Sequence, residues 1–117
     1  MSLEISKRDA ALLLDIQEAC LSIIEFTLNV SYDDYLLNKE KQSAIIHQII
    51  IMGQAVRDFS EEFMESHSEI PWFQISGMRN RLVHDYRNIL LWQVWVSATD
   101  DVPKLLDFIA PLCKDLE

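Results

Sequence analysis

Glycine and proline are scarce in this sequence, with only two glycines and three prolines among 117 residues. Tight β-hairpin turns depend on glycine or on Asn-Gly and Asp-Gly pairs, so the chain lacks the material for a fold built from many hairpins. Half of the residues are apolar and a quarter are charged, as in ordinary globular domains. A chain of this length can bury a core without disulfides or a metal. We therefore predict a single all-α domain that spans residues 1–117.

Apolar residues recur at intervals of three and four along most of the chain, which is typical of helices with one buried face. In the first helix this face includes Leu12, Ile16 and Ile23. Gly53 lies in the middle of the second helix, where it weakens the helix and indicates a close contact with another helix. Long helices are predicted over residues 6–30, 39–66, 72–86 and 89–116.

Local signals mark the interruptions between these helices. Ser31, followed by two aspartates, is typical of the start of a short helical turn. Pro71 is tolerated only in the first turn of a helix, so it indicates the helix that begins near residue 72. Pro103 is expected to kink or split the last helix. Short connections between long helices predict an antiparallel up-and-down bundle of four to five helices.

The two cysteines, Cys20 and Cys113, lie far apart and form no CxxC or Cys/His pattern. They are expected to be reduced thiols. No signal peptide is recognisable, and the most apolar run, residues 45–52, is too short to cross a bilayer. The three histidines are not spaced as ligands on one helix face. We expect a cytoplasmic protein with no membrane segment, no metal and no cofactor.

The net charge of −9 argues against a broad basic surface for nucleic acid. However, three of the five arginines, Arg79, Arg81 and Arg87, fall within nine residues that contain one acid, Asp85. This window therefore carries +2, and the rest of the chain carries −11. A local positive site on an acidic protein can still hold a phosphate, because the nearest charges determine the field in a cleft.

The same window holds the polar residues with the clearest chemical potential. Arg79 and His84 are five residues apart, so they point about 140° from each other on a straight helix. Asn80 and His84 share a face, and the Asn80 amide can hydrogen-bond the imidazole. A histidine, with an ordinary pKa near ~6.5, can exchange a proton with an RNA hydroxyl at neutral pH, and an arginine can bind a phosphate. One helix offers only one histidine, whereas a symmetric dimer would offer two.

The segment of residues 70–86, which reads IPWFQISGMRNRLVHDY, resembles the signature of HepT-like proteins of the HEPN superfamily. Their hallmark is an arginine, then four to six residues, then a histidine, usually with an asparagine after the arginine and a tyrosine two residues after the histidine. The similarity extends to SYDDY at 31–35, IMGQA at 51–55, LWQVW at 91–95 and DVPKL at 101–105.

This resemblance implies a dimeric helical bundle that cleaves RNA without metal and acts as the toxin of a toxin–antitoxin pair. It makes Arg79 and His84 catalytic, with Asn80 and Arg81 in supporting positions. The implied partner is a nucleotidyltransferase antitoxin, which in some systems transfers AMP to the tyrosine that corresponds to Tyr86. No DNA target is expected.

Two positions depart from the family pattern. Gln54 replaces a glutamate that often follows the glycine, and Asp85 replaces a glycine between the histidine and the tyrosine. The loss of one carboxylate and the added negative charge beside His84 predict weaker activity. The alternative hypothesis is therefore a non-catalytic helical module that binds a nucleotide or serves as the specificity subunit of a nucleotidyltransferase.

Overall fold

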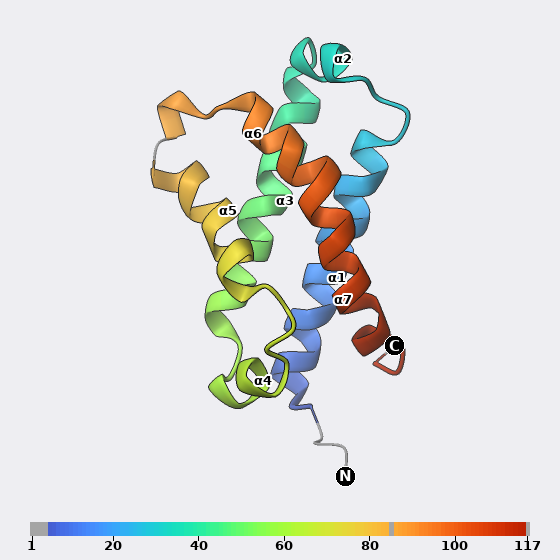
Figure 1. Cartoon of the computed structure of the whole chain (residues 1–117), viewed down its shortest axis with the longest axis vertical. Helices are drawn as coiled ribbons and strands as arrows, with labels where there is room; N and C mark the ends of the chain where they lie inside the picture. Colours follow the sequence, from blue (N-terminus) through green and yellow to red (C-terminus); the bar gives the residue numbers. More distant parts are fainter. Residues whose placement is uncertain (1–4, 85, 117) are drawn as a thin grey trace.

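The computed structural model describes residues 5–84 and 86–116, and Figure 1 shows the arrangement of their helices. The molecule measures 50 × 29 × 20 Å along its three principal axes. Successive long helices run in opposite directions along the longest of these axes. These helices are α1 (Lys7–Thr27), α3 (Lys39–Asp58), α5 (Trp72–His84), and α6 (Leu91–Val96) together with α7 (Val102–Cys113). Short helices α2 (Tyr32–Leu36) and α4 (Glu61–Ser66) connect them, and the described residues include no β-strand. The predicted all-α, HEPN-like bundle is confirmed.

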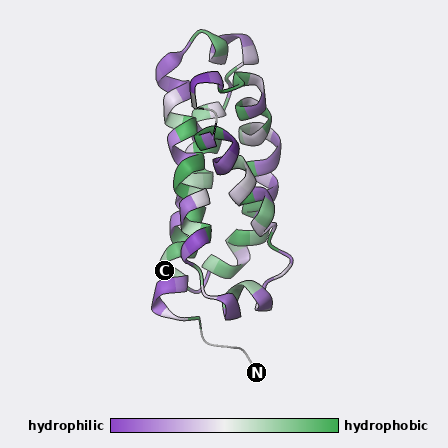
Figure 2. Ribbon diagram, turned by 90° about the vertical axis from the view of Figure 1, so that its left-hand side faces the viewer, coloured by the Kyte–Doolittle hydropathy of each residue, from purple (hydrophilic) through white to green (hydrophobic). Residues whose placement is uncertain are grey.

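The core lies between α1, α3, α5 and α7, and each helix contributes one apolar face. Hydrophobic and hydrophilic residues accordingly alternate around the helices in Figure 2. Both cysteines are free and buried. Burial, with a contribution from Cys113, raises the pKa of the Cys20 thiol to about 12. No helix within the described residues is long and apolar enough to cross a membrane.

The predicted continuous helix over residues 39–66 is wrong, because α3 ends at Asp58 and α4 begins at Glu61. The carboxylate of Asp9 accepts hydrogen bonds from the backbone amide of Ser60 at 3.0 Å and from its hydroxyl at 2.6 Å. The same hydroxyl accepts a bond from the amide of Phe63 and so caps α4. A contact with α1 thus holds the break between the two helices.

The last helical region is interrupted before Pro103 instead of at it. Residues Ser97–Asp101 form a π-helical segment, in which the amide of Val102 donates to the carbonyl of Ser97, five residues earlier. Pro103, which has no amide hydrogen, then lies in the first turn of α7, where none is needed. The chain therefore continues from α6 into α7 through one widened stretch of helix.

The predicted turn after Ser31 is helix α2, and the Ser31 hydroxyl caps it by accepting from the amide of Asp34. Its buried residue Tyr35 donates its hydroxyl to the carbonyl of Leu91 at 2.9 Å and lies 4.7 Å from the ring of Trp95. These contacts attach α2 to α6. They therefore help to hold α6 in its position opposite α5.

Candidate functional site

Helix α5 carries the predicted site residues, and its first turn follows Pro71 as expected. The helix is regular from Trp72 to His84 and ends two residues earlier than predicted. Ile75, Met78 and Leu82 face the core and fix the rotation of the helix about its axis. Arg79 and Arg81 consequently lie on opposite flanks of the helix, and Asn80 and His84 lie on its exposed face.

The flank that carries Arg79 packs directly against Gly53 of α3. A Cβ atom added at Gly53 would overlap the Cβ of Arg79 and lie 2.6 Å from its Cγ. Only glycine therefore leaves room for the stem of this arginine. The close helix contact predicted at Gly53 is present, and it determines where the Arg79 side chain runs.

The guanidinium of Arg79 is only partly satisfied. Its Nη1 donates to the side-chain oxygen of Asn80 at 3.2 Å. Its Nε is buried and has no hydrogen-bond partner, and within the described part of the chain no other buried side-chain nitrogen or oxygen lacks one. Because an unpaired buried N–H costs free energy, an acceptor that reached this donor, such as a phosphate oxygen, would remove that cost.

His84 is the last residue of α5, and its side chain is exposed. Asn80 lies one turn before it on the same face, as predicted from their spacing. Arg79, by contrast, is directed toward α3, about 140° around the helix from His84. One copy of the chain therefore does not bring Arg79 and His84 into one pocket.

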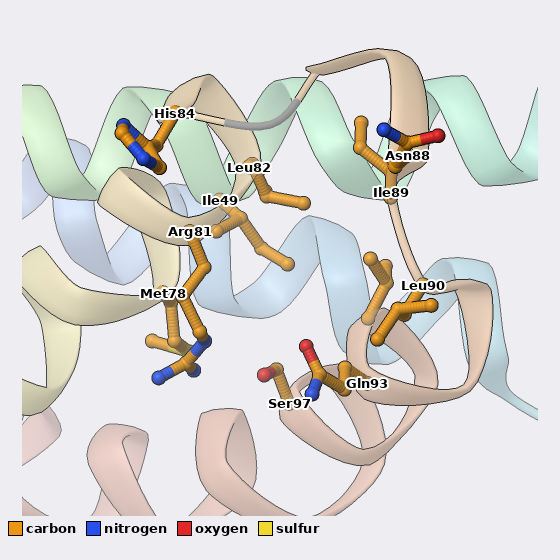
Figure 3. A pocket seen from close by; sticks show the side chains of 11 residues that line it. Ile49, Met78, Arg81, Leu82, His84, Asn88, Ile89, Leu90, Gln93 and Ser97 are labelled. Carbon is orange, nitrogen blue, oxygen red and sulfur yellow. The ribbon is translucent and has the colours of Figure 1, made fainter.

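His84 instead borders a cavity of about 250 Å³ between α5 and α6, which Figure 3 shows from close by. Arg81 extends into this region beside Met78, toward the side where Gln93 and Ser97 lie. The walls are mainly apolar side chains, which are those of Ile49, Met78, Leu82, Ile89, Leu90 and Val94.

Gln93 and Ser97 were not predicted as site residues. They are four residues apart, so they share one face of the helical stretch that runs from α6 into the π-helical segment, and their neighbours in residues 91–98 are apolar. This spacing was the available signal. The spacing could not reveal that this face lies across the cavity from Arg81, because that depends on how α5 and α6 each pack against α3.

The predicted site of AMP transfer and one departure from the family pattern lie where the structure is not described. Asp85 and the side chain of Tyr86 lie outside the described residues, and only the backbone of Tyr86 is described, in a short 3-10 turn at Tyr86–Asn88. Gln54, the other departure from the family pattern, is exposed on α3 beside Gly53. It therefore lies next to the contact that positions Arg79.

The sequence family described as Ribonuclease HepT-like matches residues 16–112, which include every helix that forms this site. The chain belongs to the HepT-like ribonuclease family. The family resemblance of the 70–86 segment is thus confirmed, and with it the prediction of a ribonuclease at the level of the family. The roles of Arg79, His84 and their neighbours stay predictions.

The alignments of this HepT-like chain with its relatives span most of both sequences. A protein of Methanocaldococcus jannaschii with the provisional name RNase MJ1380 is 38% identical over 86% of this chain and 93% of the relative. The "Probable ribonuclease HepT" of Thermococcus cleftensis is 36% identical over 78% of this chain and 83% of the relative. No solved structure matches the chain.

The described residues contain no group of three or more His, Cys, Asp or Glu side chains that could hold a metal ion. Glu61, Glu62 and Glu65 of α4, the helix that precedes α5, are exposed. Among the described residues that border the cavity beside His84, the polar ones are basic or neutral, which suits an anionic ligand.

Proposed function

We propose that this protein is a metal-independent endoribonuclease whose active site forms across a homodimer. The observation that carries the proposal is the buried, unpaired Nε of Arg79 on the same helix as the exposed His84. Arginine binds the phosphate, and histidine moves the proton. Because the two side chains point to different sides of α5, the proposal requires a second copy to complete the site.

The proposed reaction is transesterification within the RNA chain. His84 of one protomer removes the proton from a 2′-hydroxyl, whose oxygen then attacks the adjacent phosphorus. The bond from phosphorus to the 5′-oxygen breaks, and His84 of the other protomer protonates that oxygen, which leaves a 2′,3′-cyclic phosphate. Arg79 stabilises the charge on the phosphoryl oxygens, and Asn80 orients the imidazole and the guanidinium.

An exposed aromatic residue on α5 supports the dimer. Phe73 is 95% exposed and borders an apolar groove of about 580 Å³, whose lining includes Val56, Ile70 and Trp72. A two-fold dimer can place the Phe73 of each protomer in the groove of the other, because an isologous interface uses the same patch twice. Phe73, Asn80 and His84 lie on one face of α5, so this contact draws the two motifs together.

The proposed biological role is that of a cytoplasmic toxin neutralised by a nucleotidyltransferase antitoxin. Family membership supports this role. Transfer of AMP to Tyr86, two residues after His84, would add a bulky anion close to the phosphate site. Such a modification would block RNA by both volume and charge.

The first test compares growth after induced expression of the wild type, Arg79→Ala and His84→Ala, with total RNA examined in each culture. Wild type should arrest growth and degrade RNA. Each variant should restore growth, because loss of a phosphate-binding arginine or of the proton-transfer group lowers the rate by about 10²-fold or more. Purified wild type should cleave RNA equally well with EDTA present.

Equal growth and intact RNA for all three forms, at equal soluble expression, would contradict the proposal. That result would favour a second candidate, a non-catalytic specificity subunit of a nucleotidyltransferase. The exposed acidic run Glu61, Glu62 and Glu65 supports this candidate, because it offers a docking surface for a basic partner. Binding of a nucleotidyltransferase without RNA cleavage would then be the deciding measurement.

A further inference from the structure

The cavity beside His84 has the size of a small ligand site. Its volume of about 250 Å³ is just below the range of about 300–1,000 Å³ that is usual for ligand pockets. It is therefore suited to one heterocyclic ring system and not to several nucleotides. Its walls combine side chains from α5, from the 3-10 turn and from α6, so they depend on the folded bundle.

The chemistry of the walls suits a flat, polar-edged ring. Apolar side chains of Met78 and Leu82 on α5 and of Ile89 and Val94 on the opposite side can contact the two faces of such a ring. Bases bind to proteins in this way, by contact of their faces and hydrogen bonds at their edges.

Two polar groups are placed for those edge contacts. Figure 3 shows the amide of Gln93 and the hydroxyl of Ser97 side by side at one end of the cavity. Within the described residues, neither side chain has a hydrogen bond to another group of the protein. An amide supplies both a donor and an acceptor, and a hydroxyl supplies either, so together they can discriminate among base edges. Ser97 also begins the π-helical segment, a type of distortion that is frequent at functional sites.

The charged groups at the same cavity determine the orientation of a ligand. Arg81 is exposed, and no ion pair joins it to an acid in the described part of the chain. His84 lies at the rim. A nucleotide whose base lies between Gln93 and the apolar walls could therefore direct the phosphate on its ribose toward Arg81 and His84.

We propose that this cavity binds the base of the RNA nucleotide next to the scissile phosphate, and that Gln93 and Ser97 determine which base is preferred. The proposal rests on the ribonuclease function proposed above, since it assigns a specificity site to that reaction. Arg81 is then the residue that guides the phosphate from the base site to His84.

The test uses two measurements on the purified, full-length protein. The first is cleavage of four short RNAs that differ only in one base. The second is titration with the four nucleoside 3′-monophosphates, followed by NMR shifts of backbone amides. The variants are Gln93→Leu and Ser97→Ala, and the second removes one oxygen and threatens the fold little. Gln17→Leu is the control, because Gln17 is also half-buried but lies on α1.

Wild type should cleave one or two of the RNAs preferentially, and the matching monophosphate should shift the amides of α6 around Gln93 and Ser97. Each cavity variant should bind that monophosphate about three- to tenfold more weakly, as expected for one lost hydrogen bond, and should flatten the base preference. Gln17→Leu should behave as wild type.

RNA cleavage with the same base preference in wild type and both cavity variants would overturn the specificity site while leaving the ribonuclease intact. Shifts confined to residues away from α6 would also overturn it. Conversely, monophosphate binding in the cavity with no cleavage of any RNA would contradict the ribonuclease and support a nucleotide site of another kind. The two proposals therefore fail by different results.

Discussion

Gly53 has no side chain at the point where α3 meets Arg79. The space that this leaves determines the path of the Arg79 side chain, the proposed catalytic arginine. The stem of Arg79 fills the space that a Cβ at Gly53 would occupy. Gly77, the other glycine, is different: a Cβ added there would lie 3.7 Å from the nearest atom, the Nη1 of Arg81. Both glycines lie in the middle of a helix, but only Gly53 has no room for a side chain, so Gly77 can serve as its control.

We predict opposite effects when each glycine is replaced by alanine. Alanine raises helix propensity by about 1 kcal/mol in both cases, so Gly77→Ala should leave the free energy of unfolding unchanged or increase it by up to that amount. Gly53→Ala should decrease it by about 1–3 kcal/mol because of overpacking, and should displace Arg79. Urea unfolding measures the first effect.

The displacement of Arg79 has its own readout. The NMR signal of its buried Nε–H should move in Gly53→Ala, and RNA cleavage should fall toward the level of Arg79→Ala while the protein stays folded. An unchanged Nε–H signal together with normal stability in Gly53→Ala would show that Gly53 does not position this side chain.

At the scale of the elements, the break between α3 and α4 depends on one buried carboxylate. Asp9 is 4% exposed and accepts two hydrogen bonds from Ser60, across 51 positions of sequence. Burial opposes the charged form, but the bonds from Ser60, with help from Ser6 and Arg8, outweigh it and hold the pKa of Asp9 below its ordinary value. The charged carboxylate therefore stabilises the junction of α1 with α4.

We predict that Asp9→Ala decreases the free energy of unfolding at pH 7 by about 1–3 kcal/mol, because it leaves the Ser60 donors without their acceptor. Asp15→Ala, an exposed position on the same helix, should change it by no more than about 0.5 kcal/mol. Since the pKa is lowered in the folded state, the charge stabilises the protein above the unfolded pKa of about 3.9. The gap between wild type and Asp9→Ala should narrow as the pH falls below that value. A gap that widens in acid would contradict this account.

Most helix starts were predictable from local chemistry, whereas the helices end earlier than predicted. Ser31 and Pro71 act on their own first turns, so the starts of α2 and α5 follow from a few neighbouring residues. The end of α3 was not predictable, because the apolar pattern continues through Phe59 and Phe63 while the partner of Ser60 lies at the start of the chain.

At the scale of the whole molecule, the proposed active site depends on the assembly of two chains. Phe73 and Leu37 are both exposed apolar side chains, at 95% and 87%, but Leu37 follows α2, at the other end of the bundle from the start of α5. Only Phe73 lies beside an apolar groove on the helix that carries His84. These two residues therefore allow a controlled test of the interface.

We predict that wild type has the mass of a dimer in light scattering coupled to gel filtration. Phe73→Asp should have the mass of a monomer, because a buried carboxylate at each side of the two-fold interface is strongly unfavourable. It should keep its helical content but lose RNA cleavage. Leu37→Asp should remain a dimer and active. An active monomeric Phe73→Asp protein would contradict the shared site.

The sequence by itself determined the fold class, the helix that carries Arg79, Asn80, Arg81 and His84, and the family. Helical periodicity, caps and prolines act over a few residues, and the motif is contiguous, so none of these needs a partner from elsewhere in the chain. Only the tertiary structure decided that Arg79 runs across Gly53, that Asp9 holds Ser60, and that Gln93 and Ser97 face the cavity beside His84. Each of these contacts joins residues of different helices, and the rotation of each helix about its axis is determined by the packing of the core.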